Sequence, residues 1–275
     1  MKYEILKDGI LIIGKNDFNI DDILLCGQIF SFNKVDYGYD VYSLDKYAKV
    51  AEEENGYRII TNDSAYFENF FDLKTDYSLI KKELKKYPLL SEPIKFGGGI
   101  RILKQDLFET LISFIVSANN NIKRIQLILN RMREKLGKDM GGFYAFPTQE
   151  ELLKVDEKFF KEIGAGYRAG YIYKVVRQVD EKMLKDWNNL STTELRKKLI
   201  ALSGVGPKVA DCVLLFGYGR KDVFPVDTWI AKMFNKYYAP LENREEIRRR
   251  LINEFGNLAG YAQQYLFYFM RSADG

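Results

Sequence analysis

The hydrophobic pattern of this chain changes period once, near Thr61. Before that point, short apolar runs alternate with polar and turn residues, as in half-buried strands. After it, apolar residues recur at the spacing of one helix face, first in two short segments, 66–71 and 79–84. The strands are expected over residues 10–13, 28–32, 39–44 and 57–60. The longer helices are expected over residues 105–117, 122–136, 149–163, 168–185, 192–202, 207–217, 227–238, 244–255 and 258–271. The sequence therefore predicts an α+β protein, with an N-terminal antiparallel β-sheet domain followed by an all-helical body.

Three glycines at residues 97–99 mark the expected domain boundary, which assigns residues 1–99 to the sheet domain and 100–275 to the helical body. A length of 275 residues fits two domains. Residues 1–100 carry 13 Lys and Arg against 17 Asp and Glu, whereas the rest of the chain has a net charge of +8. The basic part could dock a polyanion, or it could be a solvated helical surface.

The composition excludes several kinds of active site. The chain has no histidine and only two cysteines, Cys26 and Cys212. It therefore lacks the residues for Ser-His-Asp or Cys-His catalysis, for the usual zinc sites and for a four-cysteine iron–sulfur cluster, and no metal is expected. No apolar run reaches the roughly 18 residues of a membrane span, and no signal peptide or disulfide framework is visible, so we expect a cytoplasmic protein.

The segment over residues 202–212, Leu-Ser-Gly-Val-Gly-Pro-Lys-Val-Ala-Asp-Cys, joins two expected helices. Gly204 and Gly206 flank Val205 and permit a tight turn, and Pro207 favours a helix start. Such a turn exposes backbone N–H groups at a helix N-terminus, where they can bind an anion. The pattern predicts a helix-hairpin-helix at about residues 192–217 that binds a nucleic-acid phosphate without reading sequence. A tight turn with no ligand, or an accessory domain of a polymerase, ligase or nuclease, fits this segment equally well.

Lys208 lies in the first turn of the second helix, where the helix dipole disfavours the ammonium form. A neutral amine there is a nucleophile that can form a Schiff base, although an exposed lysine could simply contact phosphate. Asp227 follows in Pro225-Val226-Asp227 and precedes another expected helix. It is predicted to cap that helix, and it could also accept a proton from Lys208 and stabilise a cationic sugar.

These motifs, with four further segments in the same order along the chain, resemble the 8-oxoguanine DNA glycosylase/AP lyases of the helix-hairpin-helix superfamily. The four segments are Cys26-Gly27-Gln28-Ile29-Phe30, which resembles the family's Gly-Gln-x-Phe strand, Ser117–Ile125 with its three asparagines, Gly164-Ala165-Gly166-Tyr167-Arg168-Ala169, and Gly260–Phe267. The resemblance covers nearly the whole chain.

The resemblance implies that the protein excises 8-oxoguanine from duplex DNA and nicks the strand without a cofactor. Lys208 would attack C1′ and form a Schiff base, and Asp227 would assist it. The flipped base would be recognised by four residues, Gly27, Cys212, Gln263 and Phe267. A further four would contact the opposite cytosine or replace the lost base: Asn119, Arg124, Tyr167 and Arg168. The phosphate would bind at Gly204, Val205 and Gly206. By the same resemblance we expect a monomer that is associated with the nucleoid of a prokaryote.

Some features leave other interpretations open. Trp229 stands where many family members have a histidine that contacts a phosphate, and its indole offers one N–H donor and no charge for such a contact. Without the resemblance, Phe267 and Cys212 would be core residues and Gly27 a strand bulge. A glycosylase for another damaged base, or a DNA-binding protein that uses only the hairpin, remains the alternative function; a small-molecule lyase with a Lys Schiff base is more remote.

Overall fold

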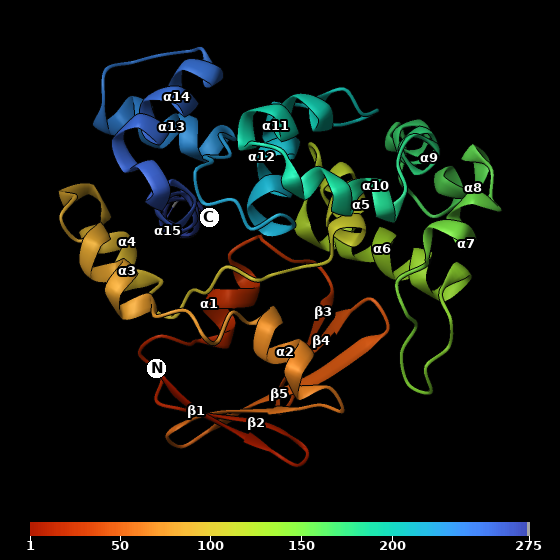
Figure 1. Cartoon of the computed structure of the whole chain (residues 1–275), viewed down its shortest axis with the longest axis horizontal. Helices are drawn as coiled ribbons and strands as arrows, with labels where there is room; N and C mark the ends of the chain where they lie inside the picture. The colour runs from red at the N-terminus through yellow and green to blue at the C-terminus, as the bar shows by residue number, and fades with distance from the viewer. Residues whose placement is uncertain (274–275) are drawn as a thin grey trace.

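The computed structural model describes residues 1–273. Its N-terminal part is a six-stranded antiparallel sheet with strand order β1-β2-β6-β5-β4-β3 (Figure 1). The strands are β1 (Lys2–Leu6), β2 (Gly9–Ile13), β3 (Phe32–Val35), β4 (Gly38–Ser43), β5 (Lys46–Glu53) and β6 (Gly56–Ile60). Helices α1 (Ile20–Leu25) and α2 (Ser64–Phe70) lie between the sheet and the remaining helices. Phe67 and Phe70 of α2 pack against Ile10, Ile12 and Val50 in one buried cluster, which explains the helical spacing of the apolar residues around position 67.

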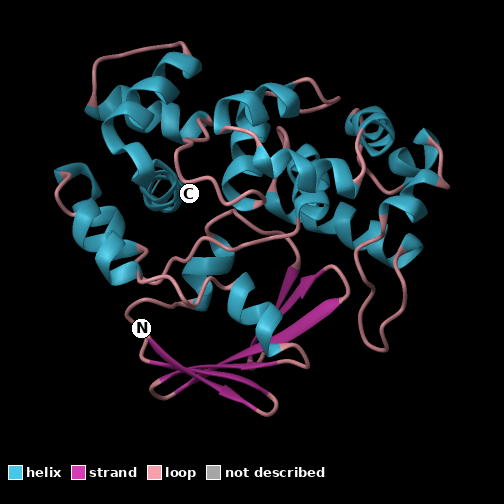
Figure 2. Cartoon of the chain, viewed as in Figure 1, coloured by secondary structure: helices cyan, strands magenta, loops and turns pink. Residues whose placement is uncertain are grey.

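The rest of the chain is helical (Figure 2), so the predicted α+β class is confirmed. Its helices are α3 (Tyr77–Leu84), α4 (Ser91–Phe96), α5 (Leu107–Ser117), α6 (Ile122–Leu136), α7 (Gln149–Leu153), α8 (Glu157–Glu162), α9 (Arg168–Gln178), α10 (Glu181–Asp186), α11 (Thr192–Ile200), α12 (Pro207–Phe216), α13 (Thr228–Tyr237), α14 (Arg244–Phe255) and α15 (Ala259–Ala273), with three 3₁₀ turns, Pro88–Leu90, Trp187–Asn189 and Gly256–Leu258. No helix within residues 1–273 is long and apolar enough to cross a membrane.

Two helices form the centres of the helical body. Helix α5 is buried from Phe108 to Val116 and packs against α6, α9, α10 and α12. Helix α15 packs against α4, α13 and α14, and its core includes Leu84 and Ile94 from the segment before the three glycines. Helices α3 and α4 therefore pack on the C-terminal helices, and the domain boundary at residues 97–99 stays a prediction.

Gly99 allows two segments of the chain to approach each other closely. A Cβ at this position would lie 2.4 Å from the backbone nitrogen of Asn19, so no larger residue fits there. The Gly99 carbonyl accepts a hydrogen bond from Asn19 N at 3.1 Å, and the N–H of Gly99 donates to the Asp22 side chain. This contact joins the connection after α4 to the start of α1.

The predicted strand over residues 28–32 is wrong, because only Phe32 belongs to a strand and residues 26–31 form an irregular segment. The side chain of Gln28 is fully buried and satisfies backbone groups instead of a sheet partner. Its amide donates to the carbonyl of Arg101 at 2.7 Å and accepts from the N–H of Leu103 at 2.9 Å. The same correction applies to the Gly-Gln-x-Phe segment, which is a turn held by side-chain hydrogen bonds.

Two predicted helices are each divided. The range 149–163 contains α7 and α8, and Asp156 caps the start of α8 by accepting from Phe159 N at 3.0 Å. The range 168–185 contains α9 and α10, and Asp180 caps α10 in the same way. An aspartate that accepts a backbone N–H begins a new helix and ends the previous one. The helices over residues 122–136 and 244–255 are confirmed at both ends.

Candidate active site

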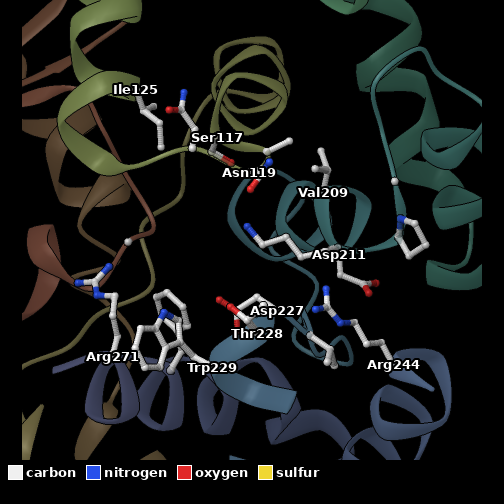
Figure 3. Close-up of a pocket in the computed structure, with 18 of the residues that line it drawn as sticks. Ser117, Asn119, Ile125, Val209, Asp211, Asp227, Thr228, Trp229, Arg244 and Arg271 are labelled. Atoms are coloured by element: carbon white, nitrogen blue, oxygen red, sulfur yellow. The ribbon is translucent and has the colours of Figure 1, made fainter. Parts of the chain in front are cut away.

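A cleft of about 1000 Å³ opens between the α5–α6 turn, the α11–α12 hairpin, the starts of α13 and α14, and the end of α15 (Figure 3). Five of the predicted site residues from distant parts of the sequence line it: Gly27, Asn119, Lys208, Asp227 and Phe267. Gly204 and Gly206 of the hairpin also line it. The close-up shows Asn119 and Val209 on one side of this space and Asp227 with Thr228 facing them.

The hairpin is built as its sequence predicts. A capping box between Ser191 and Glu194 starts α11, and Pro207 is the first residue of α12. Gly204 has φ +79°, and a Cβ there would lie 2.6 Å from the Cβ of Tyr171, so both the conformation and the space require glycine. Val205 is buried and anchors the turn, whereas Gly206 is exposed. Within the described residues no side chain caps α12, so the backbone N–H groups that follow Pro207 in its first turn, whose residues line the cleft, are available to an anion.

Lys208 lies in the first turn of α12, is half-buried and lines the cleft. Its Nζ lies 5.3 Å from the ring centroid of Phe114 on α5, so the stem runs along apolar surface. Cys212 follows one turn later on the same helix. Burial raises the pKa of its thiol to about 11, and the adjacent Lys208 opposes that shift whereas Asp227 adds to it. The three groups are therefore electrostatic neighbours.

Asp227 is the N-cap of α13, as its position before the helix predicts. Its Oδ1 accepts a hydrogen bond from the Ile230 N–H at 3.0 Å. The preceding residues Val223 and Phe224 are fully buried and fix the approach to the helix. One carboxylate oxygen is thus held by the helix end, and the half-buried side chain lines the same cleft as Lys208.

Gly27 and Phe267 meet although 240 positions separate them. Gly27 has φ +80°, and a Cβ there would lie 2.9 Å from Phe267 Cε1. The Gln264 side chain donates to the Cys26 carbonyl at 2.8 Å and so ties α15 to this turn. Phe267 is half-buried at the cleft, so it is not an ordinary core residue.

Two other predicted base-pocket residues are buried, and the cleft lining within residues 1–273 does not include them. Cys212 is 3% exposed and packs in the core around α5. Gln263 is 5% exposed, and its Oε1 has no hydrogen-bond partner in the described part of the chain. A buried amide oxygen without a partner is costly, so Gln263 retains an unused capacity to accept a hydrogen bond.

The residues predicted to face the opposite strand surround the α5–α6 turn. Asn119 has φ +49° and is exposed, and Tyr167 is 58% exposed. Arg124 is also exposed, and it donates to the Gly164 carbonyl at 3.2 Å. Arg168 is buried and its guanidinium donates to the backbone carbonyls of Ala118 at 2.7 Å and Asn119 at 2.6 Å. In this structure Arg168 therefore fixes the turn that carries Asn119.

An ion-pair network beside Lys208 was not predicted from the sequence. Asp211 is 1% exposed, lines the cleft wall, and pairs with Arg196 of α11 at 2.9 Å and with Arg248 of α14 at 2.7 Å. Burial raises the pKa of the Asp211 carboxyl, and the two guanidinium groups oppose this. A charged residue inside the apolar run of α12 was the available signal.

Three more residues that the sequence did not assign to the binding machinery line the cleft. Arg244 starts α14, and Arg271 lies in the last turn of α15. Trp229, in the first turn of α13, also lines it, and Lys232 Nζ lies 4.8 Å from its ring centroid. The cleft is therefore bordered by cationic groups on two sides.

Comparisons with known proteins agree with this arrangement. Residues 10–111 match the family model described as "8-oxoguanine DNA glycosylase, N-terminal domain", and residues 112–256 match "HhH-GPD superfamily base excision DNA repair protein". The 8-oxoguanine glycosylase/lyase of Clostridium acetobutylicum, solved with double-stranded DNA that contains cytosine opposite 8-oxoguanine, superposes with a TM-score of 0.93. It is 38% identical, and the match covers 100% of this chain and 99% of that chain.

Two proteins that are similar to this chain in sequence are named as N-glycosylase/DNA lyases. The probable N-glycosylase/DNA lyase of Methanothermobacter thermautotrophicus is 33% identical over 73% of this chain and 72% of its own length. The N-glycosylase/DNA lyase of Saccharomyces cerevisiae is 33% identical over 62% of this chain, and the match spans 56% of the yeast protein. The chain belongs to the 8-oxoguanine DNA glycosylase/lyase family of the HhH-GPD superfamily of base excision DNA repair proteins.

Proposed function

We propose that this protein is a bifunctional DNA glycosylase/AP lyase that excises 8-oxoguanine from duplex DNA and then nicks the strand. The observation that carries the proposal is a single cleft lined by an amine on α12, a carboxylate on α13, and the Gly27–Phe267 contact. These are the groups that attack at a sugar carbon and recognition of a flat base require.

Lys208 is the proposed nucleophile. Its Nζ forms a bond to C1′ as the C1′–N9 bond breaks, and the base leaves with the bonding electrons and takes up a proton. The sugar ring of this adduct then opens as the C1′–O4′ bond breaks, O4′ takes up a proton, and the amine gives up its extra proton to leave a Schiff base at C1′. The Schiff base makes the C2′ proton acidic, so β-elimination removes that proton and expels the 3′ phosphate with the electrons of the C3′–O bond. Hydrolysis of the Schiff base then releases Lys208.

Asp227 is the proposed partner of Lys208. One of its oxygens accepts from the α13 backbone, which holds the carboxylate in place. The carboxylate can accept a proton from the amine and stabilise positive charge as it develops on the sugar.

The base pocket is proposed at Gly27, Phe267, Cys212 and Gln263. 8-Oxoguanine carries a hydrogen on N7 that guanine lacks, and the Gly27 carbonyl would accept it. Phe267 would provide a flat apolar surface for one face of the base, and Cys212 would contact the other face. The Gln263 Oε1, buried without a partner among the described residues, would accept from the Watson–Crick edge.

The opposite strand is proposed to contact the turn at Asn119 and its neighbours. Asn119 and Arg124 offer donors that match the acceptors of cytosine, and the exposed Tyr167 would fill the space that the flipped base leaves. The Arg168 side chain donates from Nε and Nη2 to the carbonyls of Ala118 and Asn119 and from Nη1 to that of Ala165, so one Nη1 hydrogen is left for cytosine unless a present bond breaks. The hairpin residues Gly204, Val205 and Gly206 would hold a phosphate through backbone N–H groups.

The test is trapping with sodium borohydride on a duplex with 8-oxoguanine opposite cytosine, beside an undamaged duplex and the variant Lys208→Gln. The expected result is a covalent adduct formed only with the lesion and only with Lys208 present. Free base without an adduct would assign a monofunctional glycosylase, and neither product would refute the proposed activity. Equal excision opposite all four bases would refute the cytosine preference alone.

A further inference from the structure

The last turn of α15 places a guanidinium group at the predicted base pocket. Arg271 lines the cleft, and its Nη2 donates to the backbone carbonyl of Leu25 at the end of α1. The guanidinium carbon lies 5.2 Å from the ring centroid of Phe267, one turn earlier on the same helix. Figure 3 shows Arg271 rising from α15 beside Trp229, across the cleft from Asp211 and Arg244.

Arg271 also lies against Gly27. A Cβ built on Gly27 would be 2.9 Å from Arg271 Nη1, so only hydrogen separates this donor from the Gly27 main chain. No carboxylate pairs with Arg271 among residues 1–273, and its guanidinium donates to the neutral Leu25 carbonyl. A guanidinium has five N–H donors, so most of its capacity is free for a ligand that enters the cleft.

On this basis we propose that Arg271 is a base-recognition residue that donates to an exocyclic oxygen of the flipped base. The proposal deepens, and rests on, the function proposed above. The edge of 8-oxoguanine that contains N7–H has an oxygen on each side, O6 and O8. If the Gly27 carbonyl accepts from N7–H, the neighbouring oxygen needs a donor, and we assign that role to Arg271 Nη1 because it lies against Gly27.

The contacts of Arg271 favour the base over a phosphate as its ligand. The guanidinium packs on an aromatic ring and beside the Gly27 turn, whereas the exposed backbone N–H groups for phosphate lie at the hairpin. Contact with the Phe267 ring also holds the guanidinium in place at a small cost in conformational freedom.

The first experiment compares Arg271→Met, Arg271→Lys and the control Arg58→Met in single-turnover excision of 8-oxoguanine opposite cytosine. Arg58 lies on β6, pairs with Asp8 at 3.0 Å, and is remote from the cleft lining. Arg271→Met is expected to slow excision about 10- to 100-fold, as expected for a lost hydrogen bond to a buried acceptor. Arg271→Lys should recover part of the rate, and Arg58→Met should match the wild type.

Two further duplexes separate base recognition from other roles. An abasic-site duplex has no base, so Arg271→Met should nick it within about twofold of the wild-type rate. Equal losses on both substrates would overturn the proposal in favour of a structural defect. An undamaged duplex tests the phosphate: weaker binding by Arg271→Met, with a salt slope reduced by about one, would assign Arg271 to the backbone instead.

A second comparison separates direct contact from support of the Gly27 turn through Leu25. The comparison uses two analogues of 8-oxoguanine, one with sulfur in place of O6 and one with sulfur in place of O8. Both keep N7–H, but sulfur is a weaker hydrogen-bond acceptor than oxygen. At least one of the two sulfur substitutions should slow the wild type and leave Arg271→Met unchanged. If both slow the two enzymes equally, Arg271 only braces the turn and the proposal falls. If the wild type nicks abasic DNA but leaves 8-oxoguanine intact, the proposed substrate fails first, and this proposal fails with it.

Discussion

Asp227 has a structural and a proposed chemical role, and two substitutions separate them. Its Oδ1 caps α13 by accepting from Ile230 N at 3.0 Å, which an asparagine Oδ1 can also do. Asp227→Asn therefore keeps the cap and removes the negative charge, whereas Asp227→Ala removes both.

The structure sets the expected sizes of these effects. Loss of the cap in Asp227→Ala should cost about 1 kcal/mol and lower the Tm by about 2–4 °C for a chain of this size. Asp227→Asn loses only the interaction of its charge with the start of α13, at most about 1 kcal/mol. The excision step should nevertheless fall by about 10²- to 10⁴-fold in both variants, because proton transfer and charge stabilisation are lost together.

The assay combines thermal unfolding with single-turnover excision of 8-oxoguanine opposite cytosine. Asp180→Ala is the matched control, because Asp180 caps α10 by the same kind of bond to Met183 N but does not line the cleft. It should lose stability like Asp227→Ala and keep full excision. The reasoning is refuted if Asp227→Asn excises at the wild-type rate, or if it is as unstable as Asp227→Ala.

Three further variants or reagents test the site. Gly27→Ala would place a Cβ 2.9 Å from Phe267 at φ +80°, so excision should fall at least about tenfold while nicking of an abasic duplex persists. An unchanged excision rate would contradict the base pocket. Asp211→Ala would remove the buried carboxylate shared by Arg196 and Arg248, which leaves Arg196 with Glu245 at 2.6 Å and Arg248 with no carboxylate among the described residues, and should lower the free energy of unfolding in urea by about 3 kcal/mol. A loss below about 1 kcal/mol would show that the network is not stabilising. Burial raises the pKa of Cys26 to about 12 and of Cys212 to about 11, so both thiols stay protonated as the pH rises to 9 and should resist a thiol reagent until the protein unfolds.

The fold class was predictable because the hydrophobic period is a local property. The boundaries of individual strands and helices were harder to predict. Strand β5 was not predicted because its buried residues Ala48 and Val50 alternate with charged and small ones, so its apolar signal is weak. Residues 28–32 looked like a strand because they are apolar and buried, but Gln28 supplies the hydrogen bonds there that a sheet partner would supply.

The positions of the proposed site residues in the fold were predictable wherever a residue type matched a local helix signal. Pro207 begins α12 and Asp227 caps α13, as the sequence indicates. The position of Pro207 also places Lys208 in the first turn of α12. The place of Arg271 and the partners of Asp211 were not predictable, because they depend on contacts with other parts of the chain, although a charged residue inside the apolar run of α12 marked Asp211 as unusual. Arg168 illustrates a further limit: its type suggested a free donor, whereas the structure shows its N–H groups used by carbonyls of the α5–α6 turn.

The Asp211 network bears on how the two proposed catalytic groups stay aligned. Asp211 lies on α12, three residues after Lys208, and its partner Arg248 lies on α14, which packs against the helix that begins at Asp227. Separation of the hairpin from α13 and α14 would break the ion pair between Asp211 and Arg248. The amine, the carboxylate and the phosphate-binding turn are therefore expected to move as one unit. The base-recognition side depends instead on Gly27 and α15, so substitutions there should change which base is removed and spare the nicking of an abasic site.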